Sequence, residues 1–251
     1  MAEKLFFGNG AGIRLCGILS SKDATRPIVI QCHGFSSSKD SKTYPPLELA
    51  LGKEGIASFR FDFFGHGESQ GKFEDITITE GVRDLEAAIS FVKGLGFNKI
   101  GLFGSSFGGM IVLLIAAKHP EVRAVVAKCP VSDYIGKIVA KYSDAEMKAW
   151  EKTGYIIYTN SNGREFPLKK TFLTDSKRHS VYTVAKRIRA PTLIIHGDAD
   201  VTVPPAQSQK TASLIPHCTL DIIQGVGHDF LGKEAEVNAQ ATVFLAEKLF
   251  H

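Results

Sequence analysis

Hydrophobic residues fall in short, nearly continuous runs that alternate with segments of helical periodicity. The runs that suit strands buried on both faces are Ile28–Cys32, Ile56–Phe61, Asn98–Phe103, Val122–Ala127, Thr192–His196 and Thr219–Ile223. Residues 4–7 and 13–19 flank Gly8-Asn9-Gly10, and they predict an opening antiparallel pair of strands.

Apolar positions at helical spacing lie between most of these runs. We expect a first helix from Pro45-Pro46 to Gly52 or Gly55, and a second that is capped by Thr79 and ends near Gly94 or Gly96. Three further helices are expected: Ser106–Lys118, about Pro205–Leu214, and Glu234–Phe250. Strands that alternate with helices are typical of a doubly wound sheet. We therefore expect an α/β fold with a mostly parallel sheet of about eight strands.

This alternation breaks after Asp133. The pattern predicts a helix over Ile135–Trp150 and a strand over Tyr155–Thr159. A second strand-like piece follows Asn162-Gly163, and Asn-Gly between two such pieces indicates a hairpin. We expect residues 1–251 to form a single domain, with residues 134–187 inserted in it as a small lid or cap over the sheet.

The amino-acid composition indicates a globular protein without a strongly basic or acidic surface. Hydrophobic residues make up 44% and charged residues 22% of the 251 residues, which is ordinary for a globular chain. The formal net charge is only +4, and the densest basic stretch, Lys169–Arg189, is more typical of a solvated helix face than of an anion site. We expect no nucleic-acid partner.

Neither the cysteines nor the N-terminus indicates secretion. The four cysteines are far apart, and Cys32 and Cys129 lie in apolar runs, which favours buried free thiols over disulfides or metal ligands. No apolar stretch reaches the length of a signal peptide h-region near the N-terminus or of a membrane span elsewhere. The expected location is cytoplasmic.

The strongest chemical motif is Gly104-Ser105-Ser106-Phe107-Gly108. It matches the G-x-S-x-G nucleophile elbow, and it has the required strand before it and helix after it. Glycines two residues on either side of Ser106 leave room for a strained turn that exposes the serine. The alternative is a glycine-rich strand-to-helix turn that binds phosphate or nothing.

A serine nucleophile needs a base and a group that orients the base. His228 follows the last predicted strand in a glycine-flexed loop, at the carboxyl edge where ligands collect in such sheets. Asp198 and Asp200 follow the preceding strand; we choose Asp200 as the partner and expect Asp198 to cap its own turn. Asp133 is a more distant alternative.

The order Ser106, Asp200, His228 resembles that of the α/β-hydrolase superfamily. Further matches are His33-Gly34-Phe35, the stretch from Asp62 to Ser69, and Gly227-His228. Among its members the chain resembles cinnamoyl/feruloyl esterases and monoacylglycerol-lipase-like esterases. The resemblance implies a serine hydrolase, with an oxyanion hole made by the backbone N–H groups of Phe35 and Phe107.

The expected reaction is hydrolysis of a small or aromatic carboxylic ester through an acyl-enzyme, with no metal or organic cofactor. Aromatic residues of the insertion are candidates for substrate binding: Trp150, Tyr155, Tyr158 and Phe166. The alternatives are a lipase, thioesterase or serine peptidase with the same triad, or a ligand-binding homologue without catalysis. The expected partner is a small-molecule ester, bound by a monomer or homodimer with no membrane span.

Overall fold

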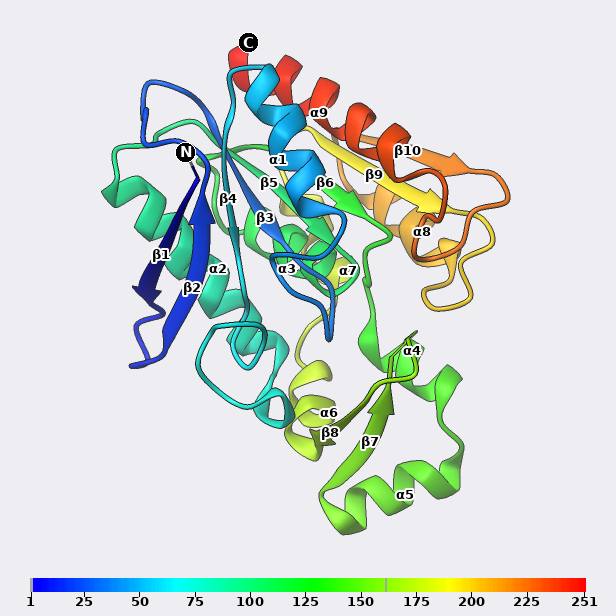
Figure 1. Cartoon of the computed structure of the whole chain (residues 1–251). Coiled ribbons are helices and arrows are strands. Elements are labelled where there is room, and N and C mark those ends of the chain that lie inside the picture. The colour runs from blue at the N-terminus through cyan, green and yellow to red at the C-terminus, as the bar shows by residue number, and fades with distance from the viewer. Residues whose placement is uncertain (1, 161) are drawn as a thin grey trace.

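A computed structural model describes residues 2–160 and 162–251 of the chain, and an eight-stranded sheet runs through it (Figure 1). The strand order is β1-β2-β4-β3-β5-β6-β9-β10. The strands are β1 (Glu3–Gly8), β2 (Arg14–Leu19), β3 (Ile28–Cys32), β4 (Ala57–Phe61), β5 (Ile100–Ser105), β6 (Val122–Lys128), β9 (Thr192–Gly197) and β10 (Cys218–Ile223).

The six strands β4, β3, β5, β6, β9 and β10 pair in parallel. β2 pairs antiparallel with both β4 and β1 at one edge of the sheet. Every residue of β3 and β4 is buried, as the continuous apolar runs predict. The predicted mostly parallel sheet of about eight strands is confirmed. Its carboxyl edge gathers the loops that follow β3, β5, β6, β9 and β10.

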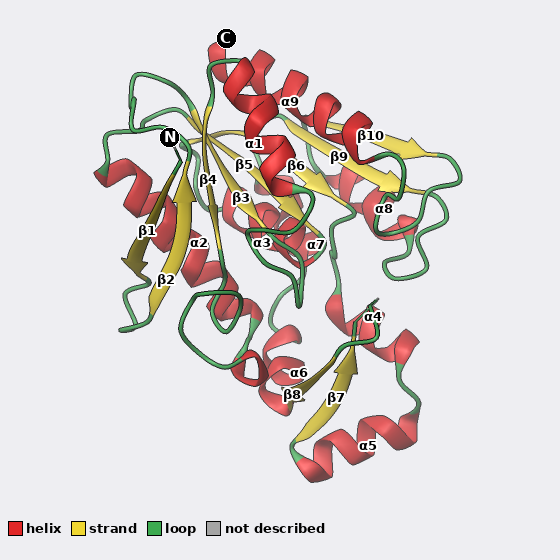
Figure 2. Ribbon diagram, viewed as in Figure 1, coloured by secondary structure: helices red, strands yellow, loops and turns green. Residues whose placement is uncertain are grey.

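Helices cover both faces of the sheet (Figure 2). On one face, α1 (Tyr44–Lys53) and α9 (Glu234–Phe250) pack together over a core that includes Leu47 and Leu245. The other face carries a larger core beneath α2 (Ile78–Gly94), α3 (Phe107–Ala116), α7 (Val181–Val184) and α8 (Pro205–Leu214). Across residues 2–160 and 162–251, no helix is both long and apolar enough to span a bilayer.

The first turn of α2 corrects one sequence prediction. Its N-cap is Thr77, whose hydroxyl accepts a hydrogen bond from the Glu80 backbone N–H at 3.0 Å. Thr79, the predicted cap, lies inside the helix and donates its hydroxyl to Asp175 at 2.6 Å. The prediction was wrong because Thr79 has a partner nearly a hundred residues away in the chain, which local capping patterns do not reveal.

The insertion segment is residues 134–187. Its first part, residues 134–176, projects from the carboxyl edge of the sheet, while α7 packs against α3 on one face of the sheet (Figure 1). The segment contains α4 (Tyr134–Lys141), α5 (Asp144–Thr153), β7 (Tyr155–Thr159), β8 (Glu165–Lys169), α6 (Lys170–Ser176), α7 and a short 3-10 turn (Ala185–Arg187). β7 and β8 pair antiparallel, as the hairpin prediction requires, although Ser161 in the connection lies outside the described residues.

The predicted helix Ile135–Trp150 is wrong in its continuity, because the chain breaks it into α4 and α5. Ser143 caps α5: its hydroxyl accepts from the Glu146 backbone N–H, and the Glu146 carboxylate accepts from Ser143. This reciprocal capping box starts a new helix and turns the chain away from the sheet.

Candidate active site

Ser106 lies at the tip of the turn between β5 and α3, with the backbone angles φ 54° and ψ −109°. A side chain at either flanking glycine would collide with the backbone. A Cβ at Gly104 would fall 2.3 Å from the Gly108 carbonyl oxygen, and a Cβ at Gly108 would fall 2.2 Å from the Cys32 carbonyl oxygen. The two glycines are therefore what permits the strained turn at Ser106.

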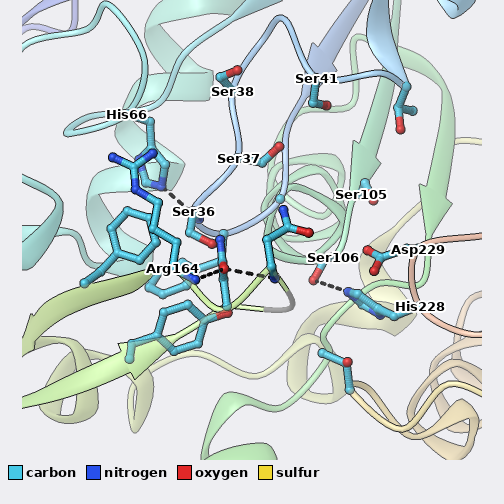
Figure 3. A pocket seen from close by; sticks show the side chains of 18 of the residues that line it. Ser36, Ser37, Ser38, Ser41, His66, Ser105, Ser106, Arg164, His228 and Asp229 are labelled. Carbon is cyan, nitrogen blue, oxygen red and sulfur yellow. Dashed lines mark hydrogen bonds between the residues drawn. The ribbon is translucent and has the colours of Figure 1, made fainter.

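Ser106, His228 and Asp200 form one hydrogen-bonded chain, of which Figure 3 shows the contact between Ser106 and His228. The Ser106 Oγ lies 3.0 Å from His228 Nε2, and His228 Nδ1 lies 2.6 Å from Asp200 Oδ2. Because a carboxylate only accepts, Nδ1 carries the proton and Nε2 is free to accept the hydroxyl proton. The structure thus brings together the three side chains that the strand ends predicted.

A second histidine contacts the same carboxylate. His196 Nε2 lies 3.1 Å from Asp200 Oδ2 and 3.0 Å from the Val203 carbonyl oxygen, so it must donate. Its Nδ1 then accepts from the Ser208 hydroxyl at 2.6 Å. The contact of His196 with Asp200 could not be predicted from the sequence, since a histidine inside a buried strand resembles any packed core residue.

These contacts set the protonation of Asp200. Burial alone would raise the pKa of Asp200, but the hydrogen bonds from His196 and His228 outweigh it and hold that pKa well below its ordinary value. Its other oxygen accepts the backbone N–H groups of Thr202 and Val203, each at 2.8 Å. Asp200 is therefore an anion fixed in position beside His228.

The two rival carboxylates have other partners. Asp198 accepts the Gly225 backbone N–H at 2.6 Å, so it joins the loop after β9 to the loop after β10. The prediction that Asp198 caps its own turn was wrong in its partner, because the loop after β10 lies within reach of the carboxylate. Asp133 caps α4 by accepting the Gly136 backbone N–H at 3.0 Å. Neither contact involves His228.

A cysteine also lies beside the histidine. The buried Cys129 thiol donates to the His228 carbonyl oxygen at 3.6 Å, and Cys129 has φ 39°. Burial would raise the pKa of Cys129, but His228 lowers it; in turn, burial would lower the pKa of His228, but Cys129 and Asp200 raise it.

Cys129, Asp200 and His228 are also a possible set of metal ligands. One ligand atom from each lies within 4.8 Å of the others. A metal ion there would replace the hydrogen bond between His228 and Asp200, so metal binding and the hydrogen-bonded chain from Ser106 to Asp200 exclude each other.

Two backbone N–H groups beside Ser106 have no acceptor within the described part of the chain: those of Phe35 and Phe107. Phe107 is the first residue of α3, where N–H groups lack helical partners. The Phe35 N–H belongs to the loop after β3. The neighbouring Ser36 N–H donates to His66 Nε2 at 3.2 Å, which fixes this loop.

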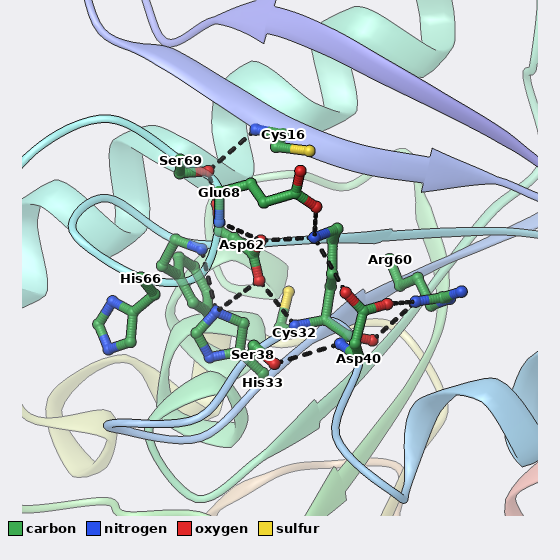
Figure 4. Close-up of polar contacts among 12 residues, drawn as sticks. Cys16, Cys32, His33, Ser38, Asp40, Arg60, Asp62, His66, Glu68 and Ser69 are labelled. Atoms are coloured by element: carbon green, nitrogen blue, oxygen red, sulfur yellow. Dashed lines mark hydrogen bonds and ion pairs between the residues drawn. The ribbon is translucent and has the colours of Figure 1, made fainter.

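An ionic cluster around the buried Lys39 and Asp62 side chains fixes the same loop (Figure 4). The Lys39 ammonium donates to Asp62 and to Glu68, each at 2.8 Å, and the Lys39 backbone N–H donates to Asp62 at 2.8 Å. Burial would lower the pKa of Lys39, but the two carboxylates raise it above its ordinary value. The cluster anchors the loop that carries the Phe35 N–H.

The Ser106 hydroxyl faces a cavity of about 1530 Å³ between the sheet edge and the insertion segment (Figure 3). Aromatic rings form part of its lining, namely Phe35, Phe73, Tyr158 and Phe166. Of the four aromatic residues predicted for substrate binding, Tyr158 and Phe166 line this cavity. Trp150 is buried against Tyr142 instead, and Tyr155 is 53% exposed on β7.

Comparison with known proteins assigns the fold to a family. The model of the family described as "Serine aminopeptidase, S33" (Hydrolase_4) matches residues 23–163. The chain is 25% identical to "Palmitoyl-protein thioesterase ABHD10, mitochondrial" of Pongo abelii, over 89% of this chain and 72% of that protein. It is 24% identical to "Monoacylglycerol lipase abhd6-B" of Xenopus laevis, over 90% of this chain and 77% of that protein.

Among solved structures, the fold is similar to that of Est1E from Butyrivibrio proteoclasticus with bound ferulic acid. The TM-score is 0.85 at 24% identity, and the match covers 98% of this chain and all of Est1E. With the family model matching more than half of its residues and the sheet and helices arranged as described, the chain belongs to the Hydrolase_4 family of α/β-hydrolases.

Proposed function

We propose that the protein is a serine carboxylic-ester hydrolase that acts through an acyl-enzyme on Ser106. The observation that carries this proposal is the continuous hydrogen-bonded chain from Ser106 through His228 to Asp200. It opens into the cavity beside two N–H groups that have no acceptor among the described residues.

In the first half of the reaction, Ser106 Oγ bonds to the ester carbonyl carbon while His228 Nε2 takes its proton. The carbonyl oxygen becomes an oxyanion that accepts the Phe35 and Phe107 N–H groups. The carbon–oxygen bond to the alcohol then breaks, and the alcohol leaves with the proton from His228. Asp200 stabilises the transient imidazolium.

In the second half, water attacks the acyl-enzyme while His228 takes one of its protons. The acid leaves, and Ser106 regains its proton from His228. The bonds that form and break involve only Ser106, His228, water and the ester, and no atom changes its oxidation state through an added oxidant or reductant.

Covalent labelling tests the nucleophile. We expect a fluorophosphonate to add one phosphonyl group to the native protein, as measured by intact mass, and Ser106→Ala to abolish both this label and ester hydrolysis. Ser105→Ala is the matched control, since its serine is adjacent but lies at the end of β5, and it should still be labelled. Near-native turnover of p-nitrophenyl acetate by Ser106→Ala would refute the proposal.

For the acyl group, we propose an aromatic ring of the cinnamoyl or feruloyl type. The support is a cluster of aromatic rings around the cavity. The ring centroid of Phe35 lies 4.9 Å from that of Phe73 and 5.1 Å from that of Tyr158, and the ring centroids of Phe73 and Phe166 are 4.6 Å apart. Edge and offset ring contacts of this kind contribute about 0.5–1.5 kcal/mol each.

Tyr158→Ala should raise the KM for methyl ferulate severalfold, because it removes one of these rings. Tyr155→Ala, on the same strand but exposed, is the control and should leave that KM unaltered. A clear preference of the native enzyme for p-nitrophenyl butyrate over methyl ferulate would argue against the aromatic pocket.

A thioester is the second candidate substrate, because a relative named as a thioesterase aligns with 89% of the chain. The same steps apply, with a thiol as the leaving group. Rates on an acyl thioester and on the matching oxygen ester decide between the two.

A further inference from the structure

The charged side chains that line the cavity are mostly positive. Its lining includes Lys42, Lys128, Lys137, Lys141 and Arg164 as cations, and Asp229 as the one carboxylate among the described residues. Lys42 is neutralised by Glu234 at 2.9 Å. Positive charge in a cleft of low dielectric attracts anionic ligands.

Three of these cations come from the insertion segment: Lys137, Lys141 and Arg164. Within residues 2–160 and 162–251, no carboxylate oxygen lies within 4.0 Å of any of their nitrogens. They lie over aromatic rings instead: Lys137 Nζ is 5.5 Å from the ring centre of Tyr134, Lys141 Nζ is 4.7 Å from that of Tyr158, and Arg164 is 5.0 Å from that of Phe166. A ring leaves the N–H groups of a cation free to bind a ligand.

Lys137 and Lys141 are one helical turn apart on α4, so both can point to the same side of the helix. Burial, together with the charge of Lys141, lowers the pKa of Lys137 to about 8. Two like charges at this spacing destabilise a helix unless an anion lies between them. The positive charges of Lys137 and Lys141 are therefore not neutralised by a carboxylate of the described residues.

The single carboxylate lies on the other side of the nucleophile. Figure 3 places Asp229 next to His228, while Arg164 lies across Ser106 from it. A negative group on a substrate would be repelled from the His228 loop and attracted to the insertion segment. This asymmetry would orient the substrate as well as bind it.

We propose that Lys137, Lys141 and Arg164 form an anion subsite, and that the ester or thioester cleaved at Ser106 carries a carboxylate or phosphate. The inference rests on the proposed function of Ser106 and narrows its substrate class. The anion belongs either to the acyl group or to the leaving group, and the contacts of the three cations suit either.

Two matched pairs of substrates test the subsite. One pair is p-nitrophenyl hydrogen glutarate and p-nitrophenyl valerate, which differ by a carboxylate on the acyl chain. The other is hexanoyl-4′-phosphopantetheine and hexanoyl-pantetheine, which differ by one phosphate on the leaving thiol. We expect kcat/KM to favour the anionic member of at least one pair by about tenfold.

The triple variant Lys137→Met, Lys141→Met, Arg164→Met should remove this preference. The control is Lys148→Met with Lys152→Met, two exposed lysines of α5 outside the cavity lining, and it should retain the preference. Equal kcat/KM within both pairs, or an unaltered preference in the triple variant, would overturn the inference.

Binding distinguishes a failed subsite from a failed nucleophile. If the native protein hydrolyses none of the four substrates and takes no phosphonate label, the proposed function is wrong. Calorimetry with hexyl phosphate and hexanol then decides the subsite. Phosphate-dependent binding that the triple variant loses supports it, and equal affinity for the two compounds refutes it.

Discussion

The Asp200 carboxylate accepts four hydrogen bonds, from His196, Thr202, Val203 and His228. A buried carboxylate held so fully stays ionised and cannot rotate away from His228. Asp198, two residues earlier, is used to join two loops. Asp200 could be chosen from the sequence because it lies further out in the loop, where the chain can bend toward His228. Both carboxylates reach the loop after β10, but Asp200 is the one of the two that contacts His228.

Cys129 could not be identified from the sequence, because its contact with His228 joins loops that are 99 residues apart. We expect Cys129→Ala to move the acid limb of the kcat/KM profile to lower pH. The negative charge of the Cys129 thiolate, which His228 favours, raises the pKa of His228, and only neutral His228 acts as a base. Without the sulfur, His228 should lose its proton at lower pH.

The measurement is kcat/KM on a p-nitrophenyl ester from about pH 5 to about pH 11, a range that includes the raised pKa of His228, about 10. Cys218→Ala is the control, since Cys218 donates only to the Thr219 carbonyl oxygen, away from His228. An acid limb that stays in place or moves to higher pH in Cys129→Ala would contradict the expected electrostatic effect of the sulfur.

At the scale of elements, the strands and most helices could be predicted because their patterns are local. The final helix, Glu234–Phe250, has the predicted bounds. The break between α4 and α5 was missed although Ser143 and Glu146 have the spacing of a capping box. Apolar positions on both sides of this break continue at helical spacing, and they concealed the capping signal.

The loop of His228 is positioned by the end of β9. A Cβ on Gly197 would fall 2.0 Å from the Val226 carbonyl oxygen, so Gly197→Ala must push the loop after β10 outward. We expect kcat to fall by about 100-fold with the fold retained, because misplacing a catalytic group by about 1 Å has an effect of this size.

Gly227→Ala is the matched control for this substitution. It lies beside His228, but its Cβ would be 3.8 Å from the nearest atom outside its neighbours, the Ala199 carbonyl oxygen. Circular dichroism verifies folding, and kcat on p-nitrophenyl acetate is the measurement. Equal kcat for the two variants would mean that the close approach at Gly197 does not position His228.

At the scale of the whole molecule, motif order and strand ends predicted which side chains meet at the carboxyl edge. They could not predict the charge of the cavity. Lys137 and Arg164 come from an irregular insertion, and their approach to Ser106 depends on how this segment folds back over the sheet. Sequence spacing contains no information about that angle.

The stability of the whole fold should depend on pH through His66, which is 4% exposed. Burial, together with the nearby His33, lowers the pKa of His66 to about 3, from an ordinary value of 6.5. The unfolded chain therefore binds this proton more readily than the folded chain. Below pH 6.5 the free energy of unfolding should fall by about 1.4 kcal/mol per pH unit through this group, until the pH reaches about 3.

We expect His66→Gln to flatten this dependence, because its amide oxygen can accept the Ser36 N–H but cannot be protonated in this range. His217→Gln, at an exposed histidine, is the control and should follow the native curve. The measurement is urea unfolding at pH values from 7 down to 4, taken as the difference between native protein and variant. That difference isolates His66 from Asp84, whose pKa burial raises to about 7 and which acts in the opposite direction. A difference that does not vary with pH would mean that His66 is not held neutral by the fold.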